Sequence, residues 1–157
     1  MANFIGLDDS TIKLSTNELS KLLANTYLLY LKTQNYHWNV TGENFQMWHL
    51  LFEKQYEELA DAVDAIAERI RMLGQHTPAS FTDFLALATI SEKDKPRSAD
   101  EMINVLLDNH DAIIVQLRYG LKALEETDDE GNIDFFIQRL REHEKTAWML
   151  RSHIKSK

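Results

Sequence analysis

Residues 44–73 read NFQMWHLLFEKQYEELADAVDAIAERIRML and give the clearest indication of the fold class. Apolar side chains recur there at intervals of three and four residues, which is the spacing of one helix face. This apolar set comprises Phe52, Tyr56, Leu59, Val63, Ile66, Ile70 and Leu73. Gly74 follows directly and suits a left-handed cap at the C-terminus of a helix. We therefore expect one helix of about 30 residues, about 45 Å long at 1.5 Å per residue.

Three more long helices and one short one are predicted along the rest of the chain. A first helix is expected over 15–39, because STNE at its start has the spacing of a capping box. SADE at 98–101 has the same spacing, so a helix is expected over 98–124. The last helix is expected over about 132–154, and a short helical crossover segment over 81–88.

Two helical hairpins joined by a long middle connection describe an all-α fold. The expected architecture is a ferritin-like four-helix bundle with a short extra helix in the crossover connection. An up-down bundle is the alternative, but all of its loops would be short. We expect a single ferritin-like domain over 1–157, with an N-terminal extension over 1–14 and a short C-terminal tail over 152–157.

Composition excludes several classes of function. The chain has 157 residues, a formal charge of −8 and no cysteine. The absence of cysteine removes disulfides, zinc–thiolate sites, iron–sulfur clusters and thiol catalysis. No secretory signal pattern is seen, and no apolar run is long enough to span a membrane, so a cytoplasmic protein is expected. The negative charge disfavours nucleic acid and anionic lipid as partners.

A set of histidines and carboxylates in the first half of the chain could bind metal. His37 and His49 are twelve residues apart around a glycine turn, so two antiparallel helices can bring them together. His49 and Glu53 are four apart and share a helix face, as do Asp64 and Glu68. Mixed imidazole and carboxylate ligands suit iron, zinc or manganese. The alternative is an ordinary solvated acidic face.

The spacing of the carboxylates points to a site between subunits. Glu53 and Asp64 are eleven residues apart, which is about 16 Å along a helix, so one helix cannot bring both to one metal. On a helical wheel the acidic stripe also faces away from the apolar core face. Two copies packed antiparallel about a two-fold axis would bring the histidines and Glu53 of one against Asp64 and Glu68 of the other, twice. The Glu-x-x-His pair of an intra-bundle di-iron site is absent.

The sequence resembles one known family over nearly its whole length. The motifs are HWNV-x-G-x-NF at 37–45, H-x-x-x-E at 49–53, D-x-x-x-ER at 64–69 and EHEKTAWMLR at 142–151. They are similar to the Dps family of mini-ferritins (DNA-protection-during-starvation proteins). The resemblance implies a four-helix subunit that assembles into a hollow homo-dodecamer. It further implies oxidation of Fe(II), usually with hydrogen peroxide, and deposition of ferric oxide inside the shell.

Carried over residue by residue, the resemblance assigns the ferroxidase ligands. They would be His37, His49 and Glu53 of one subunit with Asp64 and Glu68 of its two-fold mate. Each site would take two iron ions, and other divalent metals such as zinc could substitute. Many members have aspartate at the position of Glu53, so the longer side chain implies a changed geometry and not a lost site.

Roles are also expected for residues outside the ligand set. Trp38, next to His37, would either supply an electron or pack in the subunit interface. The resemblance implies that the acidic run at the start of the last helix lines a three-fold iron-entry pore, while capping of that helix would by itself explain one or two of these acids. The members of this run are Asp134, Asp128, Asp129 and Glu130. The other histidines, His76, His110, His143 and His153, are expected to have surface or packing roles.

DNA binding is expected to be weak or absent. Residues 1–14 contain a single basic side chain, Lys13, so no basic arm is available to neutralise phosphates. The tail after residue 150 adds Arg151, Lys155 and Lys157. A DNA-condensing nucleoid protein acting through this tail is the alternative function, and it would place the protein at the nucleoid. A structural helical oligomer without metal is a third possibility.

Overall fold

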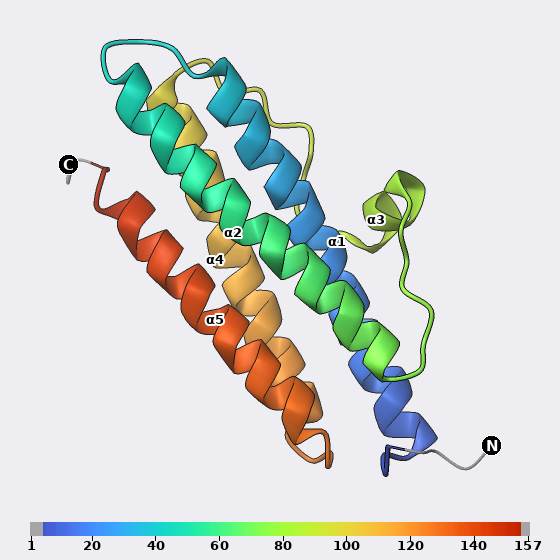
Figure 1. The fold of residues 1–157 in the computed structure, drawn as a ribbon. Coiled ribbons are helices and arrows are strands. Elements are labelled where there is room, and N and C mark those ends of the chain that lie inside the picture. The colour runs from blue at the N-terminus through green and yellow to red at the C-terminus, as the bar shows by residue number, and fades with distance from the viewer. Residues whose placement is uncertain (1–4, 155–157) are drawn as a thin grey trace.

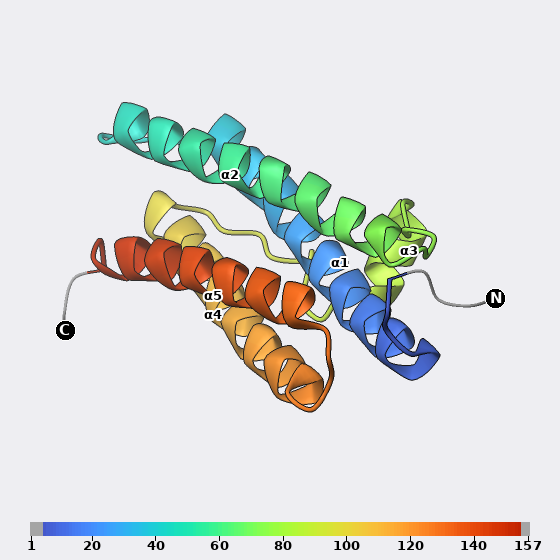
Figure 2. The same cartoon turned by 60° about the horizontal axis from the view of Figure 1, so that its bottom comes forward.

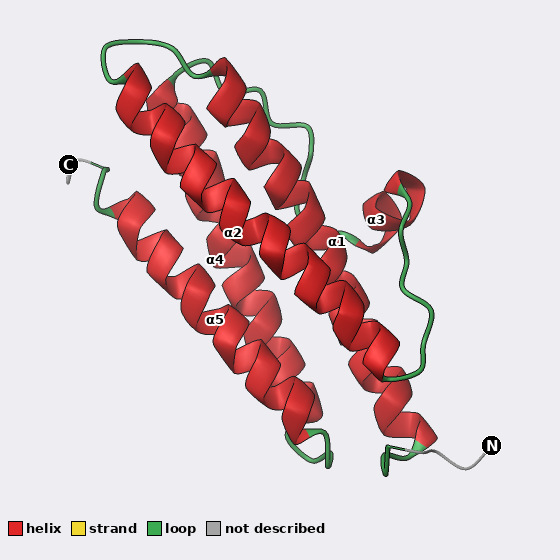
Figure 3. Ribbon diagram, viewed as in Figure 1, coloured by secondary structure: helices red, strands yellow, loops and turns green. Residues whose placement is uncertain are grey.

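The structure, a computed structural model, describes residues 5–154 and consists of helices joined by loops (Figures 1 and 3). The helices are α1 (Asp9–Asn39), α2 (Phe45–Met72), α3 (Phe81–Leu87), α4 (Ala99–Leu124) and α5 (Glu130–Arg151). No strand occurs between residues 5 and 154. The predicted all-α bundle with a short helix in its crossover is confirmed. Within the same residues, no helix is both long and apolar enough to cross a membrane.

The long helices form two antiparallel hairpins, α1 with α2 and α4 with α5 (Figure 1). The connection between the hairpins, which carries α3, returns the chain to the end of the bundle where α2 began. As a result α2 and α4 run in the same direction, which a second view also shows (Figure 2). This is the single-crossover topology, and the up-down alternative is wrong. α3 is held against α1 by stacking of Phe84 on Tyr27, with ring centroids 4.8 Å apart.

The apolar stripe of α2 faces the bundle core, as its periodicity predicts. Phe52, Leu59, Ile66 and Ile70 are almost completely buried. The opposing helices contribute further buried side chains, among them Leu19, Leu22, Leu23, Leu29, Leu106, Ile113, Leu117 and Phe136. Burial of each such side chain contributes about 1.5–3 kcal/mol. The carboxylates of α2 consequently face away from this core.

The end of α2 follows the prediction closely. Gly74 has a φ of +78°, in the left-handed region that favours glycine. Its N–H donates to the carbonyl of Arg71 at 2.9 Å, and the N–H of Gln75 donates to the carbonyl of Ile70 at 3.2 Å. These two bonds form a Schellman motif.

The start of α1 differs from the prediction. The helix begins at Asp9, because the Asp8 side chain accepts a hydrogen bond from the Thr11 N–H at 2.7 Å and caps it. Ser15, expected to cap the helix, lies inside it and donates its hydroxyl hydrogen to Oδ2 of Asp129 at 2.5 Å. The capping box at 98–101 does mark the start of α4, since Oγ of Ser98 accepts a hydrogen bond from the Glu101 N–H. α5 begins at Glu130, two residues earlier than expected, and ends at Arg151.

Replacing Ser15 by alanine is expected to destabilise the protein, because a buried carboxylate would lose a donor. Loss of such a bond costs about 1–3 kcal/mol. The melting temperature should fall by several degrees relative to wild type. Ser152→Ala is the control, since the exposed Ser152 hydroxyl donates only to the nearby carbonyl of Trp148. Equal melting temperatures for the two variants would contradict this account of Ser15.

Candidate metal centre

Two histidine side chains are held by each other's backbone where α1 ends and α2 begins. Nδ1 of His37 lies 2.7 Å from the carbonyl oxygen of His49, and Nδ1 of His49 lies 2.7 Å from the carbonyl oxygen of His37. The two rings stack with their centroids 3.8 Å apart. Gly42, with a φ of +116°, permits the turn that brings the two residues together.

This reciprocal arrangement sets the tautomer of both rings. A carbonyl oxygen only accepts hydrogen bonds, so each Nδ1 must carry the proton and donate it. When a ring held in this way is neutral, its Nε2 keeps a lone pair, and this is the form of histidine that binds metals. Phe45 stacks on His49 and Tyr56 meets His37 edge-on, at centroid distances of 5.0 and 5.1 Å. The two rings are thereby oriented before any metal binds.

Glu53 lies one turn beyond His49 on α2 and is half-buried. We call His37, His49 and Glu53 the histidine half-site. Burial, and after it the negative charges of Glu53 and Glu57, raises the pKa of the Tyr56 hydroxyl. Tyr56 is therefore a neutral group beside this half-site.

The two other predicted ligands lie elsewhere on α2. Asp64 and Glu68, which we call the acidic half-site, are exposed and lie eleven and fifteen residues beyond Glu53. Across residues 5–154, no three histidine or carboxylate side chains are close enough to hold a metal ion. One subunit thus carries two separate half-sites, and metal binding by their residues stays a prediction.

Several exposed apolar side chains lie close in sequence to His37 and His49. Trp38 is 62% exposed, Leu50 51%, Met47 45% and Phe45 43%. A cluster of exposed large apolar groups is typical of a surface that another protein covers. The surroundings of this half-site are therefore suited to contact with another protein surface.

The residues predicted to line a pore separate into two groups. Asp128, Glu130 and Asp134 are exposed at the α4–α5 turn and the start of α5. Asp129 is buried instead, where it caps α5 by accepting from the Asn132 N–H and also binds Ser15. Its carboxylate is turned into the subunit and not toward a pore.

A buried histidine pair is the main feature that the sequence interpretation missed. Nδ1 of His110 on α4 lies 2.9 Å from Nδ1 of His143 on α5. Arg139 donates to Nε2 of His143 and also pairs with Glu58 of α2. Burial, and then the charge of Arg139, lowers the pKa of His110 to about 3, and burial lowers the pKa of His143 well below its usual value. A signal was available, since both residues fall on the apolar stripes of their helices.

The hydrogen bonds determine which nitrogen of each ring carries the proton. Arg139 can only donate, so Nε2 of His143 accepts and its Nδ1 must carry the proton. Nδ1 of His143 therefore donates to Nδ1 of His110, whose own proton lies on Nε2. The pair is neutral and is buried in the core of the bundle. It is separate from both half-sites.

The chain is similar to proteins of one known family. A family model for ferritin-like domains matches residues 16–156. DNA protection during starvation protein 2 of Bacillus anthracis is 33% identical, over 87% of this chain and 93% of that protein. The chain belongs to the Dps family. Another relative of this Dps-family chain, a low temperature-induced protein of Nostoc, is 43% identical over 96% of the chain and 85% of the relative.

Solved Dps structures have the same fold. The Vibrio cholerae O1 protein, described as a member of a superfamily of ferritin-like diiron-carboxylate proteins, superposes with a TM-score of 0.94. It is 36% identical and the match covers 99% of this chain and 98% of that one. Dps from Thermosynechococcus elongatus gives a TM-score of 0.88 at 29% identity, with 95% and 97% covered.

Proposed function

We propose that this Dps-family protein stores iron and protects against oxidative damage, by oxidising Fe(II) at sites shared between two subunits. The histidine half-site of one subunit would meet the acidic half-site of its two-fold mate, and each pair of subunits would hold two such sites. The observation that carries the proposal is the reciprocal His37–His49 arrangement, which in the neutral rings leaves two oriented Nε2 lone pairs close to exposed apolar residues. A homo-dodecameric shell is part of the proposal.

The donor set suits iron as the substrate. Three carboxylates and two neutral imidazoles from the two half-sites would bind a pair of Fe(II) ions, and hard carboxylate oxygens favour the Fe(III) product. Each Fe(II) gives up one electron, and one hydrogen peroxide takes both as its O–O bond breaks to give two hydroxides. This two-electron step releases no hydroxyl radical. Zinc, which accepts similar ligands, would compete for the site without being oxidised.

Entry and electron transfer complete the proposal. Exposed carboxylates repeated around a three-fold axis would attract Fe(II), and we assign this role to Asp134, with Asp128 and Glu130 near it. Asp129 is left out because it is buried and hydrogen-bonded. Trp38 is exposed beside His37, so both of its predicted roles, electron donor and interface contact, are retained.

Condensation of DNA is the second candidate, and the described tail gives it little support. Arg151 is paired with both carboxylate oxygens of Asp111, at 2.9 and 2.8 Å. Lys155 and Lys157 lie outside the described residues. With a formal charge of −8 per chain, we expect weak or no DNA binding at physiological salt, and action in the cytoplasm.

Co-assembly of two inactive variants tests the shared site directly. Both His37→Ala and Asp64→Ala homo-oligomers are expected to be inactive. In a mixed pair of subunits, one site combines both defects and the other has all of its native ligands. Random mixing should therefore restore about one quarter of the wild-type sites. Rapid Fe(II) oxidation after addition of peroxide to the anaerobic protein is the measurement.

The control is a mixture of the two variants that were assembled separately, which should stay inactive. Differently tagged subunits, recovered together, would verify mixing in the co-expressed sample. Activity no higher than that of either single variant, in a sample shown to be mixed, would rule out the shared site.

A further inference from the structure

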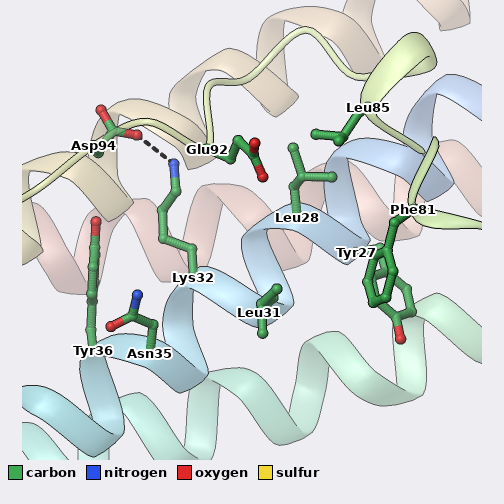
Figure 4. Close-up of a pocket in the computed structure, with 10 residues that line it drawn as sticks. All are labelled: Tyr27, Leu28, Leu31, Lys32, Asn35, Tyr36, Phe81, Leu85, Glu92 and Asp94. Carbon is green, nitrogen blue, oxygen red and sulfur yellow. Dashed lines mark hydrogen bonds and ion pairs between the residues drawn. The ribbon is translucent and has the colours of Figure 1, made fainter. Parts of the chain in front are cut away.

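The starts of α2 and α4 lie at the same end of the bundle, where α5 ends (Figures 1 and 2). Polar side chains hold the start of α4. Oγ of Ser98 accepts a hydrogen bond from the Glu101 N–H, and the Glu101 carboxylate accepts one from the Arg97 N–H at 2.6 Å. The loop before α4 is tied to α1 by the ion pair of Lys32 with Asp94, at 2.7 Å (Figure 4).

The start of α2 has no comparable polar cap. Within residues 5–154, the side chain of Asn44, which precedes the helix, makes no capping hydrogen bond, and the first turn of α2 contains no acidic residue. The first N–H groups of a helix have no partner inside the helix, so an uncapped start frays more easily than a capped one. The first turn of α2 therefore depends on packing to stay in place.

Trp48 supplies this packing. It is 8% exposed, and its backbone N–H donates to the carbonyl of Asn44 at 3.1 Å. Its indole ring stacks on Phe52 of the core, with centroids 6.3 Å apart. The ring of His153, in the C-terminal turn that follows α5 (152–154), meets the indole edge-on with centroids 4.8 Å apart and an interplanar angle of 72°. Trp48 thus contacts both the core and the C-terminal turn.

The C-terminal turn is itself held in place. The N–H of His153 donates to the carbonyl of Leu150, and the N–H of Ile154 donates to the carbonyl of Arg151, both at 3.1 Å. The Arg151 guanidinium is paired in turn with Asp111 of α4. His153 and Ile154 also line a small cavity beside the start of α4. The turn can therefore support the start of α2 against α4 and α5.

The segment supported in this way carries His49, which follows Trp48 directly. The carbonyl oxygen of His49 lies 2.7 Å from Nδ1 of His37, and Nδ1 of His49 lies 2.7 Å from the carbonyl oxygen of His37. One of these contacts uses the backbone of His49 and the other uses its side chain. A shift of the first turn of α2 would therefore disturb the orientation of both rings.

We propose that His153 is a positioning residue for the histidine half-site. By packing on Trp48 it holds the first turn of α2, and His49 and His37 thereby keep the orientation that binds metal. The inference rests on the proposed function and adds the C-terminal turn to the parts of the chain that serve it. The contact is made by an aromatic ring and uses no charge, so another aromatic side chain should replace His153.

Hydrogen–deuterium exchange of the assembled, metal-free protein tests the support of α2. In His153→Ala, the backbone amides of the peptide over 44–52 should exchange about three- to tenfold faster than in wild type. His153→Phe should exchange like wild type, because it keeps an aromatic ring against Trp48. His76→Ala is the control, since it removes another exposed histidine, from the loop after α2, and should also leave this exchange unchanged.

Zinc affinity of the same assembled variants, measured by competition with a chromophoric chelator, tests the link to the half-site. His153→Ala should bind zinc about three- to tenfold more weakly than wild type. Its KM for Fe(II) should rise by a similar factor, while kcat at saturating iron changes less than about twofold. His153→Phe and His76→Ala should match wild type in all three quantities.

The inference is overturned if His153→Ala matches wild type in exchange over 44–52 or in zinc affinity, or if His153→Phe behaves like His153→Ala. His37→Ala separates this failure from failure of the proposed function. If His37→Ala also binds zinc as tightly as wild type, the metal site itself is overturned together with the inference. If His37→Ala weakens zinc binding and His153→Ala does not, only the role of His153 is overturned.

Discussion

Asp64→Ala is expected to reduce the rate of peroxide-dependent Fe(II) oxidation by on the order of 100-fold or more, while the shell stays assembled. The reason is that Asp64 is exposed on its own subunit and, in the proposed arrangement, completes the histidine half-site of the neighbour. Truncation removes a metal ligand and no core contact. Stopped-flow ferric absorbance gives the rate, and size-exclusion chromatography gives the assembly state.

Asp61→Ala provides the matched control, because it removes the same charge from an exposed position one turn earlier on α2. Its rate should stay close to that of wild type. If both aspartate variants oxidise iron at the wild-type rate, the acidic half-site is an ordinary solvated face. If both variants oxidise iron equally slowly, the rate depends on the overall negative charge of this face and not on Asp64 as a ligand.

The stability of the protein is expected to fall steeply as the pH drops below about 6.5, because of the His110–His143 pair. Both pKa values are lowered in the folded state, that of His110 to about 3. Between these values and 6.5 the unfolded chain binds protons that the folded chain cannot bind, so acid favours unfolding. For each histidine, the free energy of unfolding should fall by up to about 1.4 kcal/mol per pH unit. This fall continues until the pH approaches the folded-state pKa. Urea midpoints from pH 7.5 to 4.5 measure this loss.

The double variant His110→Gln/His143→Gln should show a shallower dependence of the urea midpoint on pH, whatever its absolute stability. The exposed His76 offers the control, and His76→Gln should keep the wild-type slope. Carboxylates also contribute below about pH 5, but they are the same in all three proteins. Identical slopes for the double variant and wild type would refute the role assigned to the buried pair.

Features encoded by local pattern were predictable from the sequence. The period of apolar residues in α2 placed Phe52, Leu59 and Ile66 in the core, and the glycine after its last turn marked its end. The short turn after His37 was enough to predict that His49 lies beside it. These inferences rest on spacing within a few helical turns, which the chain determines without tertiary contacts.

Features that depend on partners distant in the chain were not predictable in this way. STNE has the spacing of a capping box, but Ser15 bonds to Asp129, 114 residues away, and the cap comes from Asp8. The direct contact of His110 with His143, 33 residues apart, required knowledge of how α4 and α5 are packed. The Tyr36 hydroxyl has no hydrogen-bond partner within residues 5–154, which is likewise a property of the packed state and has no signature in the sequence.

The distribution of ligands along α2 has a consequence for a newly made chain. A lone subunit, even when completely folded, holds only incomplete sets of ligands, since no cluster of three lies within residues 5–154. If the proposed sites are correct, a solitary chain neither captures iron tightly nor reacts it with peroxide. The chemistry begins only when subunits meet, at a place where the ferric product can be enclosed. Assembly would then act as the switch that turns the reaction on, and dissociation of the shell would turn it off.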